Sequence, residues 1–404
     1  MACGLLYCFY AIDEKVGNNY ERGGLKMQYR KFGKLDWQAS ALGFGCMRLP
    51  TAEGDPNSAN INEKEALRII HHAIDNGLNY LDSAYRYHSG QSEIVLGKAL
   101  KGGYRDKVRV ATKCPMPMVK TAEDYTKLLD EQLIKLDVDY LDFYLFHGLG
   151  KSTWDLVVEQ DILSKAEAAQ KAGKIRYIGF SFHDSYEVFE QIITGYDKWD
   201  MCQIQYNIID EETQAGRKGV ELAASRGLGV VVMEPLRGGK LGTPIKEVSA
   251  LMKEAGYQGT MADLAFRWLW NQPEVTVALS GMTTMEQVQE NLQSAQNAQP
   301  NALSEKEMQL IKEIRAAYGA RTGIPCTSCG YCLPCPQSIP IPRTLGFYNE
   351  GLIYDYYEES KRVYAIFGGN ADKCVQCKEC EAKCPQSIPI SEWMTKINEA
   401  FSAK

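Results

Sequence analysis

The sequence of 404 residues predicts an α/β protein, a (β/α)8 TIM barrel followed by a small, mainly helical domain. From about residue 39 to 295, short apolar runs alternate with amphipathic segments, which is the pattern of repeated βα units. Eight of the 13 cysteines lie between Cys326 and Cys384, which separates the end of the chain from the rest. The length is also too great for one ordinary domain, so we expect two.

Eight apolar runs predict the strands of the barrel. Eight βα units in about 250 residues is the size of a TIM barrel. A doubly wound open sheet is the alternative, and it is less favoured because no GxGxxG follows the first run. The predicted strands are Ala41–Met47, Leu78–Asp82, Val108–Lys113, Tyr140–His147, Ile175–Ser181, Met201–Tyr206, Gly229–Met233 and Val275–Ser280.

The segments between these runs have helical periodicity. Between Asn62 and Asn76, apolar residues recur at i, i+3, i+4 and i+7, and Gly77 can end the helix in the left-handed conformation. Near the end of the barrel, Ser304 and Glu307 form a capping-box pattern that predicts a helix to about Tyr318. Beyond it, Gly319 and Gly323 are expected to loosen the chain before the first clustered cysteine.

These patterns divide the chain into three parts. We expect residues 27–300 to form the barrel and residues 301–404 the cysteine-rich domain. The first 26 residues carry no periodicity that continues into the barrel, whereas Met27 opens a strand-like segment. We therefore expect Met27 to be the natural start, and residues 1–26 to be a non-native or disordered extension.

Charge and hydropathy exclude two classes of partner. Lys and Arg number 45 against 51 Asp and Glu, a net charge of −6, and no basic run could neutralise a series of phosphates. No apolar stretch approaches the roughly 18 residues that span a bilayer. We expect a cytoplasmic protein that binds neither nucleic acid nor membrane, with its thiols reduced.

Two cysteine motifs predict metal clusters. The first is C-x2-C-x2-C-x2-C followed by Pro336, and the second is C-x2-C-x2-C-x3-C followed by Pro385. The second has the spacing of the bacterial ferredoxin run, whose thiolates hold [4Fe–4S] clusters. Two zinc sites are the alternative, but zinc usually takes two cysteine pairs separated by a longer loop. The cysteines are Cys326, Cys329, Cys332, Cys335, Cys374, Cys377, Cys380 and Cys384.

In two-cluster ferredoxins the fourth cysteine of each run serves the other cluster. By that rule one cluster is held by Cys326, Cys329, Cys332 and Cys384, and the other by Cys374, Cys377, Cys380 and Cys335. The x2 spacing before Cys335 departs from the usual x3. The tyrosine-rich stretch between the motifs, residues 345–367, can be helical, which favours a helical ferredoxin-like domain. Two nearby clusters favour electron transfer, and a structural role is the alternative.

Polar residues also stand at the ends of successive predicted barrel strands, where TIM-barrel active sites lie. They are Asp82, Tyr87 just beyond it, Lys113 and His147. A tyrosine is a poor acid at neutral pH unless a cation lies beside it, and a buried lysine with a carboxylate partner would supply that cation. Together with a histidine that hydrogen-bonds a substrate oxygen, the set suits protonation of a carbonyl oxygen while hydride reaches the carbon.

With these residues in view, the segment from about 27 to 295 resembles the aldo-keto reductases. The resemblance rests on LGFGCMRL, LDSAYRYHSGQSEIVLGKAL, ATK, YLDFYLFH, GKIRYIGFSFH, QIQYN and QVQENL. It implies that Asp82, Tyr87, Lys113 and His147 are the catalytic tetrad, with Tyr87 as general acid. It also implies a nicotinamide nucleotide bound without a Rossmann fold, in agreement with the missing GxGxxG.

The same resemblance implies contacts to the nucleotide. Ser181 and Gln203 would hold the carboxamide, Gly45 would border the nicotinamide, and Glu290 with Asn291 would meet the adenine end.

Several positions depart from the family pattern. The asparagine after the carboxamide serine is Phe182, and the aromatic residue under the nicotinamide aligns with Met233. The lysine and arginine that grip the 2′-phosphate of NADPH align with Gly281 and Gln287, which cannot pair with a phosphate dianion. NADH is therefore at least as plausible a cofactor as NADPH.

The barrel and the cysteines together resemble a subgroup of aldo-keto reductases with a C-terminal ferredoxin-like domain. The predicted function is hydride transfer between a nicotinamide cofactor and a small carbonyl or alcohol, with two [4Fe–4S] clusters for electron transfer and a ferredoxin or other redox protein as a further partner. The alternatives are a plain NAD(P)H carbonyl reductase with structural or redox-sensing clusters, and an electron-transfer module whose barrel docks a partner. The βα loops, with residues such as Trp154, Tyr206 and Arg237, would decide the substrate.

Overall fold

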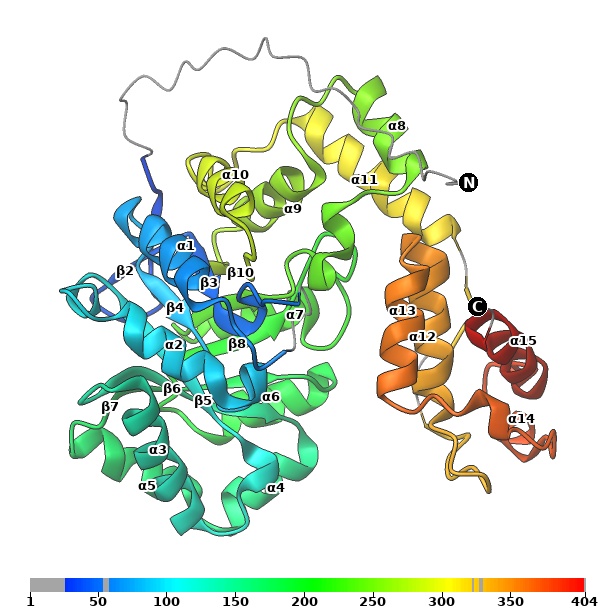
Figure 1. Cartoon of the computed structure of the whole chain (residues 1–404), viewed down its shortest axis with the longest axis horizontal. Helices are drawn as coiled ribbons and strands as arrows, with labels where there is room; N and C mark the ends of the chain where they lie inside the picture. The colour runs from blue at the N-terminus through cyan, green and yellow to red at the C-terminus, as the bar shows by residue number, and fades with distance from the viewer. Residues whose placement is uncertain (1–25, 54–57, 322, 327–329, 403–404) are drawn as a thin grey trace, which may run out of the picture.

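A computed structural model of the chain describes residues 26–53, 58–321, 323–326 and 330–402. The extension expected at residues 1–26 therefore lies outside the described residues, apart from Lys26. Figure 1 shows a barrel wrapped by helices, with the C-terminal helices packed beside it.

Eight parallel strands close into a barrel in the order β10-β3-β4-β5-β6-β7-β8-β9. Each of the eight predicted runs overlaps one of these strands, so the TIM barrel is confirmed and the open sheet is wrong. A two-stranded antiparallel sheet, β1 with β2, precedes them. The strands are β1 Tyr29–Lys31, β2 Gln38–Ser40, β3 Leu42–Gly45, β4 Tyr80–Asp82, β5 Arg109–Cys114, β6 Leu141–Leu149, β7 Ile175–Phe182, β8 Met201–Gln205, β9 Gly229–Met233 and β10 Val277–Ser280.

Helices follow the strands and cover the outside of the barrel (Figure 1). They are α1 Glu63–Asp75, α2 Gln91–Ala99, α3 Ala122–Leu136, α4 Lys151–Glu159, α5 Ile162–Lys171, α6 Tyr186–Gly195, α7 Gly216–Ser225, α8 Lys246–Glu254, α9 Met261–Trp270, α10 Met285–Ala295 and α11 Glu305–Ala320.

The helix-capping residues predicted from the sequence are present in both α1 and α11. In α1 the Asn62 side chain accepts a hydrogen bond from the Glu65 amide, and Gly77 beyond the end has a φ of +94°. In α11 the reciprocal capping box of Ser304 and Glu307 is present. Gly319 lies inside α11 and does not loosen the chain, so that expectation is wrong.

The β1–β2 hairpin fills the N-terminal mouth of the barrel. The Phe32 ring lies 6.1 Å from the ring centre of Tyr80 and 4.8 Å from that of Phe143, both of which point into the barrel. Arg30 of β1 donates to the backbone carbonyls of Gln272 at 2.9 Å and Val275 at 2.6 Å. The bottom of the barrel is therefore sealed, and the opposite rim is left for a site.

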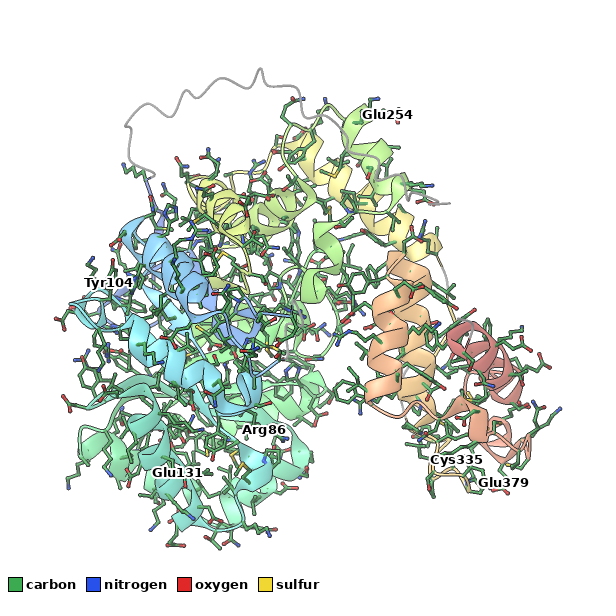
Figure 2. The ribbon with its side chains drawn as sticks, in the orientation of Figure 1. Arg86, Tyr104, Glu131, Glu254, Cys335 and Glu379 are labelled. Atoms are coloured by element: carbon green, nitrogen blue, oxygen red, sulfur yellow. The ribbon has the colours of Figure 1, made fainter. Side chains whose placement is uncertain are left out.

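After the barrel the described chain is helical, as the sequence predicts, and residues 345–367 form parts of two helices joined at Asp355. Several short elements form a small apolar core of their own, with residues from Ile324 to Phe401. In Figure 2, Cys335 and Glu379 lie at the end of this region opposite α11. The helices are α12 Ile341–Tyr354, α13 Tyr357–Ile366, α14 Glu379–Ala382 and α15 Ile390–Ser402.

The two parts of the chain share apolar contacts. Helix α11, which lies beyond the expected boundary at residue 300, buries Leu310, Ile311 and Ile314 in the same apolar core as the barrel helices. Tyr354 at the end of α12 belongs to that core as well. The division at residue 300 stays a prediction about folding units, and the packing continues across it. Among the described residues, no helix has the length and apolar content needed to cross a membrane.

Candidate active site and cluster site

The four predicted catalytic residues meet at the C-terminal rim of the barrel. Asp82 ends β4, and Tyr87 lies in the short 3-10 turn that follows. Lys113 stands near the end of β5, and His147 lies near the end of β6. Because the strands are parallel neighbours, their ends converge on one face. The structure therefore brings the predicted tetrad together.

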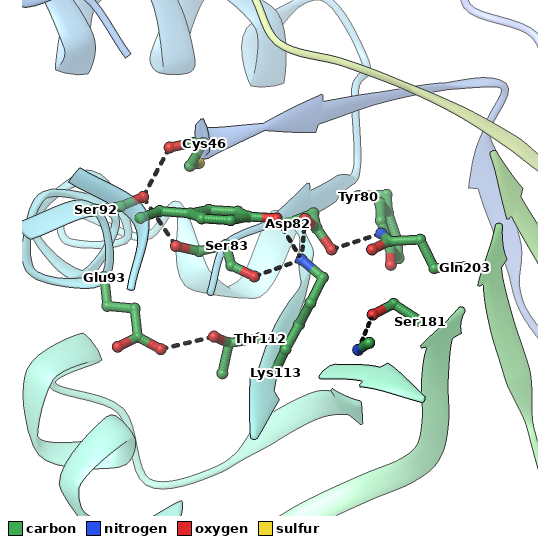
Figure 3. A network of polar contacts seen from close by, with 12 residues as sticks. Cys46, Tyr80, Asp82, Ser83, Ser92, Glu93, Thr112, Lys113, Ser181 and Gln203 are labelled. Atoms are coloured by element: carbon green, nitrogen blue, oxygen red, sulfur yellow. Dashed lines mark hydrogen bonds and ion pairs between the residues drawn. The ribbon is translucent and has the colours of Figure 1, made fainter. Parts of the chain in front are cut away.

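Lys113 is the centre of this arrangement (Figure 3). Its Nζ donates to Asp82 Oδ1 at 2.5 Å, to the Ser83 carbonyl at 2.7 Å and to Tyr87 Oη at 3.4 Å. Asp82 Oδ2 also accepts from Gln203 Nε2 at 2.9 Å. Lys113 and Asp82 are each 1% exposed. A buried ion pair is tolerated only when its remaining polar atoms are also satisfied, and this pair meets that condition.

Burial acts on every ionisable member of the site. It lowers the pKa of Lys113, but attraction to Asp82 and Tyr87 outweighs burial and leaves the pKa raised. Burial raises the pKa of Asp82, although Lys113 opposes it. The ammonium of Lys113 therefore stays charged across the neutral range, next to a carboxylate that balances it.

The Tyr87 hydroxyl lies beside the Lys113 ammonium, as the sequence predicts. Burial raises its pKa above 10, and the charge of Lys113 offsets only part of that rise. The net direction is upward because desolvation of the phenolate exceeds the attraction of one ammonium. Tyr87 keeps its proton at neutral pH and can release it only to a strongly basic oxygen, such as an alkoxide forming on a substrate.

His147 faces Tyr87 across the site. The two ring centres are 6.1 Å apart with an interplanar angle of 85°. Burial, together with repulsion from Lys113, lowers the pKa of His147 to about 3. His147 is therefore a neutral imidazole at physiological pH, able to hydrogen-bond a substrate oxygen without competing for the proton of Tyr87.

A strained turn fixes the position of Tyr87. The next two residues, His88 and Ser89, have φ values of +50° and +53°, which is unusual for residues with a side chain. His88 Nε2 accepts a hydrogen bond from the Leu49 amide at 3.1 Å and holds the turn against the segment after β3. The sequence analysis did not single out His88.

A second buried polar network lies behind β5. Thr112 Oγ1 donates to Glu93 Oε1 at 2.6 Å (Figure 3), and Gln132 Nε2 reaches the same carboxylate oxygen at 2.5 Å. Gln132 also accepts from Tyr144 Oη at 2.7 Å. Since Thr112 precedes Lys113 on the strand, this network holds the backbone that presents the lysine.

The tetrad opens into a cavity of about 670 Å³. Asp82, Tyr87 and His147 line it, and so do three of the predicted nicotinamide contacts, Gly45, Ser181 and Gln203. Ser181 Oγ accepts from the Gly148 amide at 2.8 Å, which leaves its own hydroxyl proton free to donate. A cavity of this size and polarity fits a nicotinamide ring and a small substrate.

The two predicted adenine contacts lie elsewhere. Among the described residues that line the cavity, neither Glu290 nor Asn291 appears. Glu290 is exposed and accepts from Thr260 Oγ1 at 2.5 Å. Asn291 is buried and donates to Ser280 Oγ at 3.0 Å, and Ser280 does line the cavity. The side chain of Ser280 therefore lies between Asn291 and the cavity.

The structure adds a cation that the sequence analysis missed. Gln287 uses its side-chain oxygen to cap α10, accepting from the Thr283 amide at 2.7 Å. Gly281 lies under the side chain of Arg48, whose carbons come within 3.2 to 3.3 Å of the place where a β-carbon would be. Arg48 comes from the segment after β3 and lines the cavity. It brings a guanidinium to the region where the family's phosphate-gripping side chains are absent.

The cavity has a wall that the sequence did not indicate. Helix α12 contributes Glu350 to its lining, helix α13 contributes Glu359, Ser360 and Val363, and Tyr356 between the two helices also lines it. These residues belong to the cysteine-rich part of the chain, so the cavity lies between the two parts.

Of the three residues expected to influence the substrate, only Arg237 lines the cavity. Trp154 packs against Trp199 with 6.3 Å between ring centres, and Tyr206 is fully buried and donates to Gln272 at 2.9 Å. Glu234 also lines the cavity. It directly follows β9, so the strand-end rule that selected the tetrad could have found it.

The described cysteines of the second part fall into two groups. Cys326, Cys332 and Cys384 line one small cavity walled by apolar residues such as Leu345 and Ile388. These are three of the four ligands that the crossing rule assigns to one cluster.

The fourth of those ligands, Cys329, lies outside the described residues. The other group contains Cys374 and Cys377, whose charges add to burial in raising the pKa of Cys380 to about 11. Cys335 packs partly buried on the apolar core, and Cys377 is exposed. Within the described ranges no three His, Cys, Asp or Glu residues stand close enough to hold a single metal ion. A polynuclear cluster suits thiolates that converge on an apolar cavity with this spacing.

The fold and the tetrad define a barrel oxidoreductase, and comparison with known proteins agrees. Residues 41–316 match the Aldo/keto reductase family, and residues 325–388 match a 4Fe-4S dicluster domain. The chain therefore belongs to the aldo/keto reductase family and carries a C-terminal iron–sulfur domain. The zinc alternative is set aside by the second match.

Individual relatives cover the barrel. A probable aldo-keto reductase 1 from Glycine max is 27% identical over 71% of this chain and 89% of its own length. The NADH-specific methylglyoxal reductase of Escherichia coli is 26% identical over 70% of this chain and 97% of its own. Among solved structures, the aldo-keto reductase AKR11C1 from Bacillus halodurans (holo form) is similar, with a TM-score of 0.59 and 27% identity over 72% of this chain and 96% of that protein.

Proposed function

We propose that this chain transfers hydride between a nicotinamide nucleotide and a small carbonyl or alcohol, in a cytoplasmic setting. The observation that carries the proposal is Lys113, whose Nζ joins the Asp82 carboxylate to the Tyr87 hydroxyl at the floor of the cavity. A structural lysine would need only the carboxylate. A lysine that also touches a tyrosine hydroxyl facing a cavity suits proton transfer.

Each residue has a part in carbonyl reduction. When bound, the nicotinamide supplies the hydride. Tyr87 holds the proton that the carbonyl oxygen receives, and neutral His147 hydrogen-bonds and orients that oxygen. Lys113 stabilises the tyrosinate that remains, and Asp82 keeps Lys113 charged and fixed. In alcohol oxidation the same groups act in reverse.

For the nucleotide we propose Ser181 and Gln203 at the carboxamide, Gly45 at the ring, and Glu290 with Asn291 toward the adenine. The cavity lining supports the first three. NADH is proposed to serve at least as well as NADPH, because Gly281 has no side chain to pair with a phosphate and Gln287 is engaged in a helix cap. The nearby Arg48 guanidinium is the feature that would favour NADPH. The ratio of kcat/KM for the two nucleotides measures this preference.

We further propose two [4Fe–4S] clusters with crossed ligands that pass electrons, with a ferredoxin or another redox protein as a further partner. The shared cavity of Cys326, Cys332 and Cys384 supports the crossing. A hydride carries two electrons and each cluster passes one, so coupling between the barrel and the clusters would require a group, such as a flavin, that splits the electron pair.

Two substitutions test the whole proposal. Tyr87→Phe removes the proton donor, and we expect a loss of about 10²- to 10⁴-fold in carbonyl reduction. Cys377→Ala removes one exposed cluster ligand. Loss only in Tyr87→Phe supports plain carbonyl reduction with structural or redox-sensing clusters. Loss in both supports coupling between clusters and barrel. Unchanged activity in Tyr87→Phe would overturn a catalytic barrel and favour a docking role.

A further inference from the structure

The iron–sulfur domain covers the open side of the active-site cavity. Asp82, Tyr87, His147 and the proposed nicotinamide contacts line the barrel side, and five residues between Glu350 and Val363 line the other. Figure 1 shows these two helices standing beside the barrel. A substrate in contact with Tyr87 therefore lies in a space bounded by both parts of the chain.

The covering helices are fixed to the barrel by specific contacts. Lys240, in the segment after β9, pairs with Glu350 of α12 at 2.8 Å. The guanidinium of Arg237 lies 5.1 Å from the ring centre of Tyr354, which in turn lies 5.4 Å from that of Tyr318. Tyr354 is only 5% exposed. Since buried aromatic packing anchors the wall, its residues can hold a substrate in a defined position.

Two buried polar atoms, on residues that line this cavity, lack a hydrogen-bond partner within the described part of the protein. One is Oγ of Ser360 on α13, a residue that is 2% exposed, and the other is Nε of Arg237 on the barrel side. Both residues line the cavity. Buried polar groups are almost always paired in native proteins, so an unpaired hydroxyl and an unpaired N–H on two residues that line the same cavity favour a ligand that pairs with them. Arg237 also has a φ of +48°, a strained conformation of the kind found at ligand sites.

The charges on this side of the cavity are compensated. Arg237 pairs with Asp210, Lys240 pairs with Glu350, and Glu359 pairs with Arg362 at 2.6 Å. Paired charges leave little net field for a carboxylate or phosphate on the substrate. A hydroxyl group, by contrast, can accept from Arg237 Nε and exchange a hydrogen bond with Ser360 Oγ at no cost in charge.

We infer that Ser360 and Arg237 form a substrate-positioning subsite for a neutral hydroxyl group of the carbonyl substrate. The iron–sulfur domain thereby determines part of the substrate specificity of the barrel, independently of any electron transfer. This inference rests on the proposed function, because it concerns the substrate of that same site.

The test compares two carbonyl substrates with equal carbon number, glyceraldehyde and propanal. In the holoenzyme, Ser360→Ala should raise KM for glyceraldehyde about 10-fold more than KM for propanal, the effect of losing one hydrogen bond to a hydroxyl. Ser360→Leu should fill the subsite and reduce kcat/KM for glyceraldehyde further. Ala365→Leu adds similar bulk to an exposed position of the same helix and serves as the matched control. Iron content and NADH binding, measured on each variant, report whether the domain remains folded.

The outcomes separate the inference from the proposed function. If the wild-type protein reduces neither substrate, the proposed function fails. If propanal is reduced but Ser360→Ala changes both KM values equally or leaves both unchanged, the subsite is overturned. Preference for glyoxylate over glyceraldehyde, weakened by Ser360→Ala, would overturn the assignment of a neutral hydroxyl. A larger effect from Ala365→Leu than from Ser360→Leu would also overturn it.

Discussion

The barrel site and the cysteine region present opposite solutions to holding reactive groups. In the barrel, Lys113 and Asp82 are fully buried and satisfied by protein groups, with Ser83, Tyr87 and Gln203 as partners. In the cysteine region, Cys326, Cys332 and Cys384 border a small cavity whose other described lining residues are mostly apolar. The first site is preformed by the chain, whereas the second is completed by the group it binds.

The two regions also differ in how the fold supports them. The barrel core runs continuously from Met27 to the helices around Leu310, while the apolar core of the cysteine region is confined to residues between Ile324 and Phe401. Small cores contribute little net stability and are commonly supplemented by metals. Substitutions at the two sites should therefore have different effects. In the barrel they should lower activity and stability, and at the cysteines they should lower the iron content.

The largest effect is expected from Lys113→Met. The variant leaves the Asp82 carboxylate buried without its cation, which costs about 3–5 kcal/mol for such pairs. Carbonyl reduction should also fall to the level of Tyr87→Phe. Urea unfolding followed by circular dichroism measures the first effect. Lys151→Met, which removes an exposed pair with Asp155, is the control and should unfold like the wild type. A Lys113→Met protein as stable as the control would show that the barrel site is not preformed in this way.

The next effect concerns the crossed ligands. Cys384→Ser should lower the iron content to about half, because it removes a ligand of one cluster only. By the crossing rule, the EPR spectrum of its remaining cluster should match that of Cys326→Ser and differ from that of Cys380→Ser. Cys202→Ala, a buried cysteine of β8, is the control and should keep all iron. A Cys384→Ser spectrum matching that of Cys380→Ser would contradict the crossing.

A smaller effect is expected where the two regions meet. Glu350→Gln removes the charge that faces Lys240 across the boundary, at side-chain exposures of 31% and 16%. A partly exposed pair of this kind contributes up to about 1 kcal/mol, and less at high salt. The urea midpoint should fall slightly at low salt and converge with the wild type in 1 M NaCl. Glu358→Gln, on an exposed position of α13, controls for the change in net charge. Equal effects of the two substitutions would argue against a specific contact.

A separate effect is expected in the response of the barrel to pH. His147 has its pKa lowered from 6.5 to about 3, so its contribution to stability is fully present above pH 6.5 and is lost as the pH falls toward 3. His147→Asn should flatten the dependence of the unfolding free energy on pH in that window. The pKa of Tyr87 is raised, so kcat should hold through neutral pH and fall only above pH 10. An inflection of kcat near pH 6.5 that disappears in His147→Asn would show that His147 titrates normally.

Much of the barrel site could be predicted from the sequence. The strand ends are readable because buried parallel strands are short apolar runs, and the polar residue that ends each run must face the rim. Asp82, Lys113 and His147 were found by that rule. Arg48 and His88 were not, because their roles depend on which loop lies over which, and no local pattern records that packing.

The sequence by itself determined the (β/α)8 barrel, the positions of Asp82, Tyr87, Lys113 and His147 at or just beyond strand ends, and the two cysteine runs, since each follows from spacing along the chain. Only the tertiary structure decided the net pKa of Tyr87, which depends on burial, and the grouping of Cys384 with Cys326 and Cys332 at one cavity. It also decided that Ser360 faces the active-site cavity, although 273 positions separate it from Tyr87 along the chain. Contacts of this kind depend on which surfaces of the folded barrel and of the C-terminal helices fit together. Residue spacing along the chain does not determine that fit.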